Sequence, residues 1–285
     1  MALRINYNLA SSSAQRGLGA SQEAYAKQAN RLSTGLRINS ASDDAAGMAV
    51  SEKLKNQVRG LNQAQRNAQD GISLIQTAEG ALTETHSILA RMRELAVQAA
   101  NDTLNNTDRT SLEAEFTQLK AEVTRIAGAT QFNGTVLLNG ATSSLTLQVG
   151  ANSTDTVTVA LTNNTVGSTT YAAASGVAGL GIGPVSVTIT SLALAATTIT
   201  ALDAAINQVS TNRANLGSMQ SRLESVGRSL AVASENTAAA NSRVADADIA
   251  SSMSELVRAQ ILQQAGISVL AQANQAPALV LQLLK

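Results

Sequence analysis

Two long stretches of the chain place apolar residues at alternating intervals of three and four positions. In the first stretch a column of apolar residues recurs every seven positions, and a second column, three positions further on, holds mostly small residues. This spacing is typical of a long helix that packs lengthwise against other helices, and the small column lets a partner lie close. The first column consists of Leu54, Leu61, Ala68, Ile75, Leu82, Leu89 and Ala96.

This first rod is predicted to begin near Ser42, Asp43 and Asp44. Ser42 can cap free N–H groups, and the two carboxylates suit the positive end of a helix. The rod is predicted to end near Asn101. About 57 residues at about 1.5 Å each give a rod of roughly 85 Å, which cannot bury itself alone.

A second helix is predicted from the apolar residues between Leu112 and Ile126, which again step by three and four. Thr107 or Asp108 is expected to cap its start, and Gly128 to end it. The loop at 101–106 is short enough to fold this helix back antiparallel on the first rod.

The middle of the chain changes from a helical to a strand pattern. Turn signals occur at 131–134 and 139–140, and alternating apolar residues predict one β-hairpin near 145–161. From there to about residue 198 the chain is rich in Gly, Ser, Thr and Ala without a clear period. Residues 166–198 are therefore expected to form a short surface loop, with one possible strand at 185–189.

The seven-residue period returns in the C-terminal part, which predicts a second rod matching the first. The seven-residue spacing is interrupted around Asp246 and Asp248 and resumes at Ile249, which indicates a joint between two helices. Pro277 is expected to end or kink the last helix. The apolar residues predicted to pack the two rods together are Leu54, Leu61, Ile75, Leu82 and Leu89 in the first and Leu202, Val209, Leu216, Leu223 and Leu230 in the second.

The first 35 residues resemble the last segment in being rich in Ala and Gln and poor in charge, and Gly35 is a plausible helix stop. The expected fold is therefore mainly α, a long antiparallel helical bundle or coiled coil with a small β-hairpin, in which the N- and C-terminal helices pair. The residues predicted to assemble this terminal pair are Leu18, Tyr25, Leu32, Ile249, Met253, Leu256, Ile267 and Leu270.

The balance of charge narrows the classes of function. The chain has 20 basic and 20 acidic residues, so it lacks the basic surplus that nucleic acids or anionic membranes require. No run of 18 apolar residues predicts a membrane span, and Met1–Ala20 lacks a signal-peptide core. If the protein is exported, a cleaved signal is not expected to direct it.

The side chains that usually carry chemistry are scarce. His86 is the only histidine and there is no cysteine. A metal site would lack further ligands of these types, and His86 as a catalytic base would lack a nucleophile or an orienting residue. The glycine-rich run 176–183 lacks the Lys-Ser or Lys-Thr of a phosphate loop. Asp43 and Asp44 are better explained by helix capping than by a cation site. We therefore expect no enzyme activity, no cofactor and no metal.

Several motifs, in the right order, resemble bacterial flagellin. The N-terminal signature runs from Leu32 to Ala41 and continues from Asp43 to Gly47, and Gln131–Gly134 also fits. At the other end, Ala273–Pro277 and Val280–Lys285 match. The resemblance covers about residues 1–140 and 199–285.

This resemblance implies a subunit that polymerises with copies of itself into the extracellular flagellar filament used for swimming. It further implies secretion by the flagellar type III export channel, and an export chaperone, the filament cap and hook-junction proteins as partners. The implied domains are an inner one from 1–44 and 246–285 (D0) and a helical one from 45–165 and 199–245 (D1). Residues 166–198 are too few for a stable outer domain, so a minimal flagellin is expected.

Arg91, Leu95 and Glu115 match positions that, in the family, contact a toll-like receptor of animal hosts. Arg91 and Leu95 are four residues apart and share one helix face. Packing between subunits is the competing explanation for these residues, and both roles are compatible.

Three alternatives remain open from the sequence. A hook–filament junction protein shares the terminal helices but usually has a larger middle. A filament-displayed metalloprotease needs a His-Glu-x-x-His helix, which one histidine cannot supply. A helical signalling module of the chemoreceptor type would need a membrane span and a charged hairpin tip.

Overall fold

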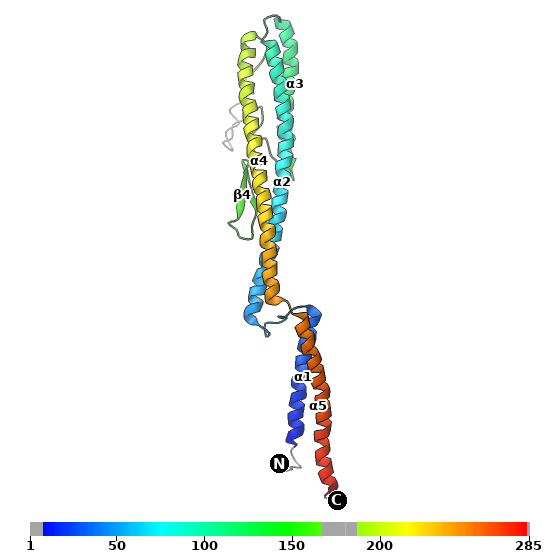
Figure 1. The fold of residues 1–285 in the computed structure, drawn as a ribbon. Coiled ribbons are helices and arrows are strands. Elements are labelled where there is room, and N and C mark those ends of the chain that lie inside the picture. Colours follow the sequence, from blue (N-terminus) through cyan, green and yellow to red (C-terminus); the bar gives the residue numbers. More distant parts are fainter. Residues whose placement is uncertain (1–7, 167–179, 181–186, 284–285) are drawn as a thin grey trace. The chain divides into compact units, whose positions relative to one another are not determined.

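The computed structural model describes residues 8–166, 180 and 187–283, which are mainly helical (Figure 1). They divide into two compact units: Met1–Val58 with Glu235–Lys285, called unit 1 here, and Arg59–Ser234, called unit 2. The predicted fold class is confirmed. The described helices are α1 (Leu9–Thr34), α2 (Ala45–Ala99), α3 (Asn106–Ala129), α4 (Leu192–Ala245) and α5 (Ile249–Leu283).

Local side chains set the ends of α1 and α2. Gly35 ends α1 as predicted, with a φ of 70° and its N–H donating to the carbonyl of Arg31. The cap of α2 is Asp44, whose Oδ1 accepts the N–H of Gly47 at 2.8 Å. The prediction that Ser42 caps this helix was wrong, because its hydroxyl bonds to that of Ser40 instead.

The second predicted helix, α3, starts with a capping box. Asn105 accepts the N–H of Asp108, and the Asp108 carboxylate accepts the N–H of Asn105. Asp108 therefore contributes as the third residue of the helix rather than as the cap. Gly128 does not end α3, which continues to Ala129, and this prediction was wrong.

The core of unit 2 lies between α2, α3 and α4. The apolar column of α2 is buried from Leu61 to Ala96, and its small column is buried from Ala64 to Ala99. Phe116 of α3 is fully buried in the same cluster. Small side chains in one column let the helices approach until van der Waals contact is continuous. The buried residues of the α4 column are Leu202, Val209, Leu216, Leu223 and Leu230.

Two hairpins connect α3 to α4. Strands β1 (Gln131–Phe132) and β2 (Thr135–Val136) join through Asn133 and Gly134, whose φ values of 47° and 79° suit a tight hairpin turn. The longer hairpin pairs β3 (Ser144–Gln148) with β4 (Thr156–Ala160), as predicted.

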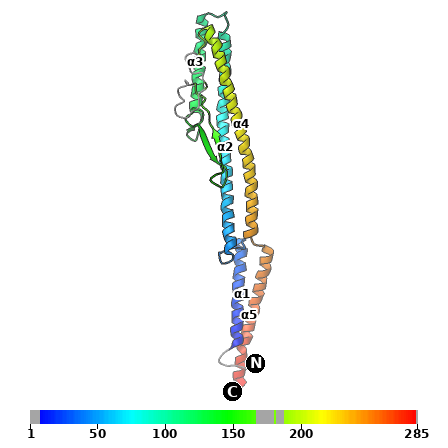
Figure 2. The ribbon, with the colours of Figure 1, turned by 90° about the vertical axis from the view of Figure 1, so that its left-hand side faces the viewer.

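The β3–β4 hairpin lies against α2 (Figure 2). Asn67 donates its side-chain amide to the carbonyl of Gln148 at 2.9 Å, and Leu147 packs over Gly71. A glycine on α2 makes room for this close approach. The hairpin therefore covers one side of the helical core.

The segment before α4 differs from the expected surface loop. Residues 192–198 are helical, and Ile189 is fully buried with its N–H bonded to the Glu113 carboxylate at 2.7 Å. No strand forms at 187–189, and 185–186, like 167–179 and 181–184, lie outside the described residues. The loop prediction was wrong for 187–198, because Ala, Thr and Ile there pack into the core rather than toward water.

By length and composition α4 would be able to cross a membrane, but the start of this helix buries Ala195, Leu202 and Val209 in the core of unit 2. A core helix meets the same criterion. Pro277 does not end α5, which continues to Leu283.

Packing at Gly71 predicts a sharp position effect. A Cβ at Gly71 would collide with Leu147 and lie 3.2 Å from Leu223 Cδ1, whereas a Cβ at Gly80 on the same helix meets no atom within 4 Å. We expect Gly71→Val to lower the free energy of unfolding by about 1–3 kcal/mol through overpacking. Gly80→Val should change it by less than about 0.5 kcal/mol. Urea unfolding followed by circular dichroism measures both, and equal effects would contradict the packing described.

Candidate functional site

The terminal helices α1 and α5 lie side by side and antiparallel in unit 1 (Figure 1). The least exposed residues of each helix recur at intervals of three and four, which is the spacing of a two-helix seam. Most of them are small or polar, so the pair is held by close approach rather than by large apolar side chains. They are Ser11, Ala14, Leu18, Ser21, Tyr25, Gln28 and Leu32 on α1 and Ser252, Leu256, Ala259, Gln263, Gly266, Leu270 and Ala273 on α5.

Hydrogen bonds fasten both ends of this pair. At one end Asn8 donates its amide to the carbonyl of Ala273 at 2.8 Å, while Ser11 donates to Asn274 at 2.9 Å. At the other end the backbones join, because Arg37 donates its N–H to the carbonyl of Ala245 at 2.7 Å. The joint between α1 and α2 is thus tied directly to the joint between α4 and α5.

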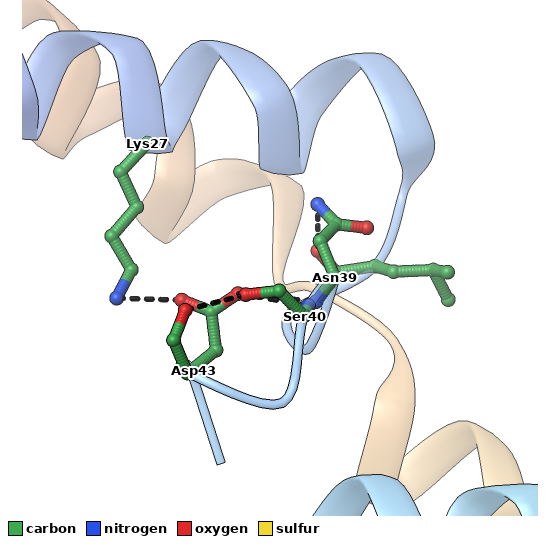
Figure 3. Close-up of polar contacts among 6 residues, drawn as sticks. Lys27, Asn39, Ser40 and Asp43 are labelled. Carbon is green, nitrogen blue, oxygen red and sulfur yellow. Dashed lines mark hydrogen bonds and ion pairs between the residues drawn. The ribbon is translucent and has the colours of Figure 1, made fainter. Parts of the chain in front are cut away.

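Asp43 organises the α1–α2 joint (Figure 3). Its Oδ1 lies 2.7 Å from Lys27 Nζ, and its Oδ2 accepts hydrogen bonds from the N–H groups of Asn39 and Ser40 at 3.2 and 3.3 Å. The hydrogen bond from Lys27, followed by that from Asn39, lowers the pKa of Asp43 from 3.8 to about 2. The carboxylate is therefore ionised, and it holds the turn that leads into α2.

The predicted assembly residues of the terminal helices fall into two groups. Five lie in the seam between α1 and α5, whereas the other three lie outside it. The seam uses Ser252 and Gly266 in place of the predicted Met253 and Ile267, which is a rotation of one residue. The sequence does indicate this seam, because the small residues Ser252, Ala259 and Gly266 recur every seven positions on α5. In the seam lie Leu18, Tyr25, Leu32, Leu256 and Leu270, and outside it lie Ile249, Met253 and Ile267.

The surface of α5 away from α1 carries seven large apolar side chains that no described residue covers. Ile261, for example, has 60% of its surface exposed. From Ile249 to Leu283 the only ionisable residues are Glu255 and Arg258, which pair with each other at 3.6 Å. Exposed apolar side chains in this number mark a surface that binds another molecule. The exposed large apolar residues are Ile249, Met253, Val257, Ile261, Leu262, Ile267 and Val269.

The three predicted receptor residues lie on α2 and α3 in unit 2. Arg91 pairs with Glu115 at 2.9 Å and with Glu94 at 3.0 Å, and these hydrogen bonds raise the pKa of Arg91. Leu95 is only 1% exposed and belongs to the core. The structure thus brings Arg91 and Glu115 together at the surface, whereas Leu95 lies in the core.

Arg109 is a structural residue that sequence reasoning missed. It is 5% exposed, and its guanidinium donates to the carbonyls of Ala99 and Asn101 and to the side chain of Asn106. Those carbonyls lie at the C-terminal end of α2, where a cation is favourable. An arginine soon after a short loop is too common a pattern to have indicated this contact.

One unit has a buried helical core, and the other is a pair of helices that leaves many large apolar side chains exposed. This combination is typical of a self-assembling helical-bundle protein. Comparison with known proteins agrees with this class. Family models for the bacterial flagellin N-terminal helical region and C-terminal helical region match residues 5–143 and 199–284. The chain belongs to the bacterial flagellin family.

Individual relatives are similar over nearly the whole chain. A flagellin of Halalkalibacterium halodurans is 48% identical over 281 residues, covering 99% of both chains. The flagellar filament 31.3 kDa core protein of Treponema maltophilum is 43% identical over 294 residues, again covering 99% of both. The crystal structure of Bacillus cereus flagellin is 37% identical, covering 58% of this chain and 88% of that chain with a TM-score of 0.49.

The function follows from the family. The chain is a structural subunit that polymerises with copies of itself into the bacterial flagellar filament, and it is not an enzyme. Its length matches a minimal flagellin. The alternative of a hook–filament junction protein is not favoured, because the curated relatives are flagellins and filament core proteins.

The Asp43 contacts predict how the joint responds to acid. Because the pKa of Asp43 is lowered on folding, its ionised form stabilises the folded joint above the ordinary value of 3.8, and this contribution is lost as the pH falls through about 2. We expect Lys27→Met to move the pKa back toward 3.8, as measured by NMR titration of the carboxyl group. Lys53→Met, at an exposed lysine of the same unit, should leave it near 2. An unchanged pKa in Lys27→Met would contradict the assignment.

Proposed function

We propose that α1 and α5 form the assembly core of the filament, and that neighbouring copies cover the apolar surface of α5. The observation that carries this proposal is that α5 leaves seven large apolar side chains exposed, because α1 covers only one side of it. Burying a valine or isoleucine side chain contributes about 1.5–3 kcal/mol. Several such side chains per subunit, repeated along a polymer, give a large driving force for association.

The small and polar seam supports the same proposal. Ser21, Gln28 and Gln263 lie where a stable two-helix coiled coil would place leucines. An isolated helix pair of this composition has only marginal stability in water. We infer that the pair gains most of its stability on assembly, which would also suit a chain that is exported largely unfolded.

The domain scheme follows from this division. We propose that residues 1–44 and 246–285 form the inner layer of the filament, and that 45–165 and 187–245 form the next layer. Subunits would act outside the cell after passing through the flagellar export channel. An export chaperone, the filament cap and the hook-junction proteins are the expected partners.

Truncation tests the assembly role of the terminal helices. Removing residues 1–35, or all residues after Ile249, should abolish filaments in electron micrographs of seeded subunits. The buried core of unit 2 does not include these residues, so its helical circular dichroism and cooperative unfolding should remain. Filaments of normal appearance from either truncation would refute the proposal.

Point substitutions test the apolar surface of α5 more finely. We expect Val257→Gln with Ile261→Gln to raise the critical concentration for polymerisation by at least about tenfold, because two side chains lose burial in the filament. Ser254→Gln, at an exposed polar position of the same helix, should change it by less than about threefold. Sedimentation of filaments from subunits gives these values. Equal critical concentrations for the two variants would contradict the role proposed for this surface.

We further propose that Arg91 and Glu115 form a contact surface for a toll-like receptor of animal hosts, supported by the buried Leu95. The favouring observation is that the two charged side chains are exposed, adjacent and held together across α2 and α3. The buried Leu95 would act by fixing the helix positions rather than by direct contact.

Reporter cells bearing the receptor test this surface. Arg91→Ala with Glu115→Ala should lower the response to purified subunits by about tenfold or more, as expected when a central charged pair of an interface is lost. Arg125→Ala with Glu122→Ala removes another exposed ion pair on α3 and should leave the response unchanged. No response to the unaltered subunit, or an equal response to both variants, would rule the proposal out.

A further inference from the structure

Two asparagines of unit 2 are each followed directly by a glycine. They are Asn133 before Gly134 and Asn139 before Gly140, and the sequence holds no other pair of this kind. An asparagine in this position is prone to lose its side-chain amide, because a glycine has no Cβ to keep its backbone nitrogen away from the asparagine side chain. The sequence alone makes both asparagines candidates for this reaction, and the fold distinguishes between them.

The first pair forms the turn of the β1–β2 hairpin and is open to water. Asn133 and Gly134 are both exposed, and no described residue forms a hydrogen bond with the Asn133 side chain. Each strand of this hairpin has only two residues, so few hydrogen bonds oppose its opening. When the hairpin opens, the Gly134 nitrogen is able to approach the side-chain carbon of Asn133.

The second pair is held by its surroundings. The side-chain oxygen of Asn139 accepts the backbone N–H of Ala141 at 2.9 Å. Gly140 is buried, and a Cβ built on it would lie only 2.8 Å from Asn163 Cγ, closer than packed carbon atoms approach. The preceding residue, Leu138, is 1% exposed and belongs to the core of unit 2. Rotation of the backbone at Asn139 would therefore disturb packed residues.

We propose that Asn133 is a site of spontaneous deamidation, and that the fold protects Asn139 from the same reaction. The backbone nitrogen of Gly134 attacks Asn133 Cγ, which closes a succinimide ring, and the C–N bond of the side-chain amide breaks. Ammonia leaves with the proton that the Gly134 nitrogen gives up. Water then opens the ring, either at Cγ to give aspartate or at the backbone carbonyl of residue 133 to give isoaspartate. Water is the only co-reactant.

The isoaspartate product does not fit the turn. It adds one carbon atom to the backbone between Asn133 and Gly134, whereas a two-residue hairpin turn needs positive φ values at both positions, here 47° and 79°. Both products also place a negative charge at the turn. The pairing of Phe132 with Thr135 beside the turn should therefore be lost. The β3–β4 hairpin, which has five residues in each strand, should be unaffected.

Peptide mapping by mass spectrometry of the full chain tests the site. In folded protein kept in mildly alkaline buffer, Asn133 should react at least about tenfold faster than Asn139, since local opening costs less free energy at the exposed hairpin. The same protein in concentrated guanidinium chloride is the control. Without the fold, the two asparagines should react at rates within about threefold of each other, because a glycine follows both.

Amide hydrogen exchange measures the effect on the hairpin. Residues 131–137 should exchange faster in aged protein than in fresh protein, while β3 and β4 exchange equally in both. Asn133→Asp introduces the aspartate product without isoaspartate, so its exchange at 131–137 should stay closer to that of fresh protein.

Two results would overturn the proposal. One is reaction of Asn139 as fast as Asn133 in the folded chain, and the other is an Asn133 that reacts only after unfolding. Unchanged exchange at 131–137 in aged protein would contradict the effect on the turn. None of these results bears on the roles proposed for α5 or for Arg91 and Glu115.

Discussion

The constraint on which the rest depends is that one chain cannot cover its own last helix. The α5 helix carries large apolar side chains on several sides, and α1 shields only the side made of Ser252, Ala259, Gly266 and their neighbours. Water is a poor solvent for the remaining surface. Polymerisation removes this surface from water, so the same feature that weakens the isolated subunit favours the filament.

The two units accordingly differ in how they are held together. Unit 2 buries large residues such as Phe116, Leu82 and Leu223 inside a core of three helices and a hairpin. Unit 1 relies on small residues, on hydrogen bonds at its two ends and on the ionised Asp43 at its joint. Unit 2 has a buried core of its own, whereas unit 1 leaves apolar surface exposed. This difference suits a monomer that becomes fully stable only when it joins the filament.

The sequence predicted most of the fold because long heptad columns leave few arrangements open. The columns of α2 and α4, the β3–β4 hairpin and the joint after Ala245 all follow from periodicity. Predictions failed where local signals compete. Asp44 rather than Ser42 caps α2, because three adjacent residues could each accept the free N–H groups. Pro277 lies inside α5, which continues beyond it.

The candidate site was harder to predict for a physical reason. In α5 apolar or small residues occur in several columns, so periodicity alone does not distinguish the seam through Ala259 from the column through Met253. Close approach at small residues decides the rotation, and this depends on the partner helix. The buried role of Arg109 was equally hard to predict, since two of its three acceptors are backbone carbonyls, which no residue type identifies.

Amide hydrogen exchange along α5, compared between free subunits and filaments, tests the central claim most directly. The account predicts rapid exchange in the free subunit and strong protection in the filament, while amides of α2 near Leu82 stay protected in both states. Equal protection of α5 in both states would show that the terminal pair is stable alone. That result would contradict the dependence of this helix on neighbouring copies.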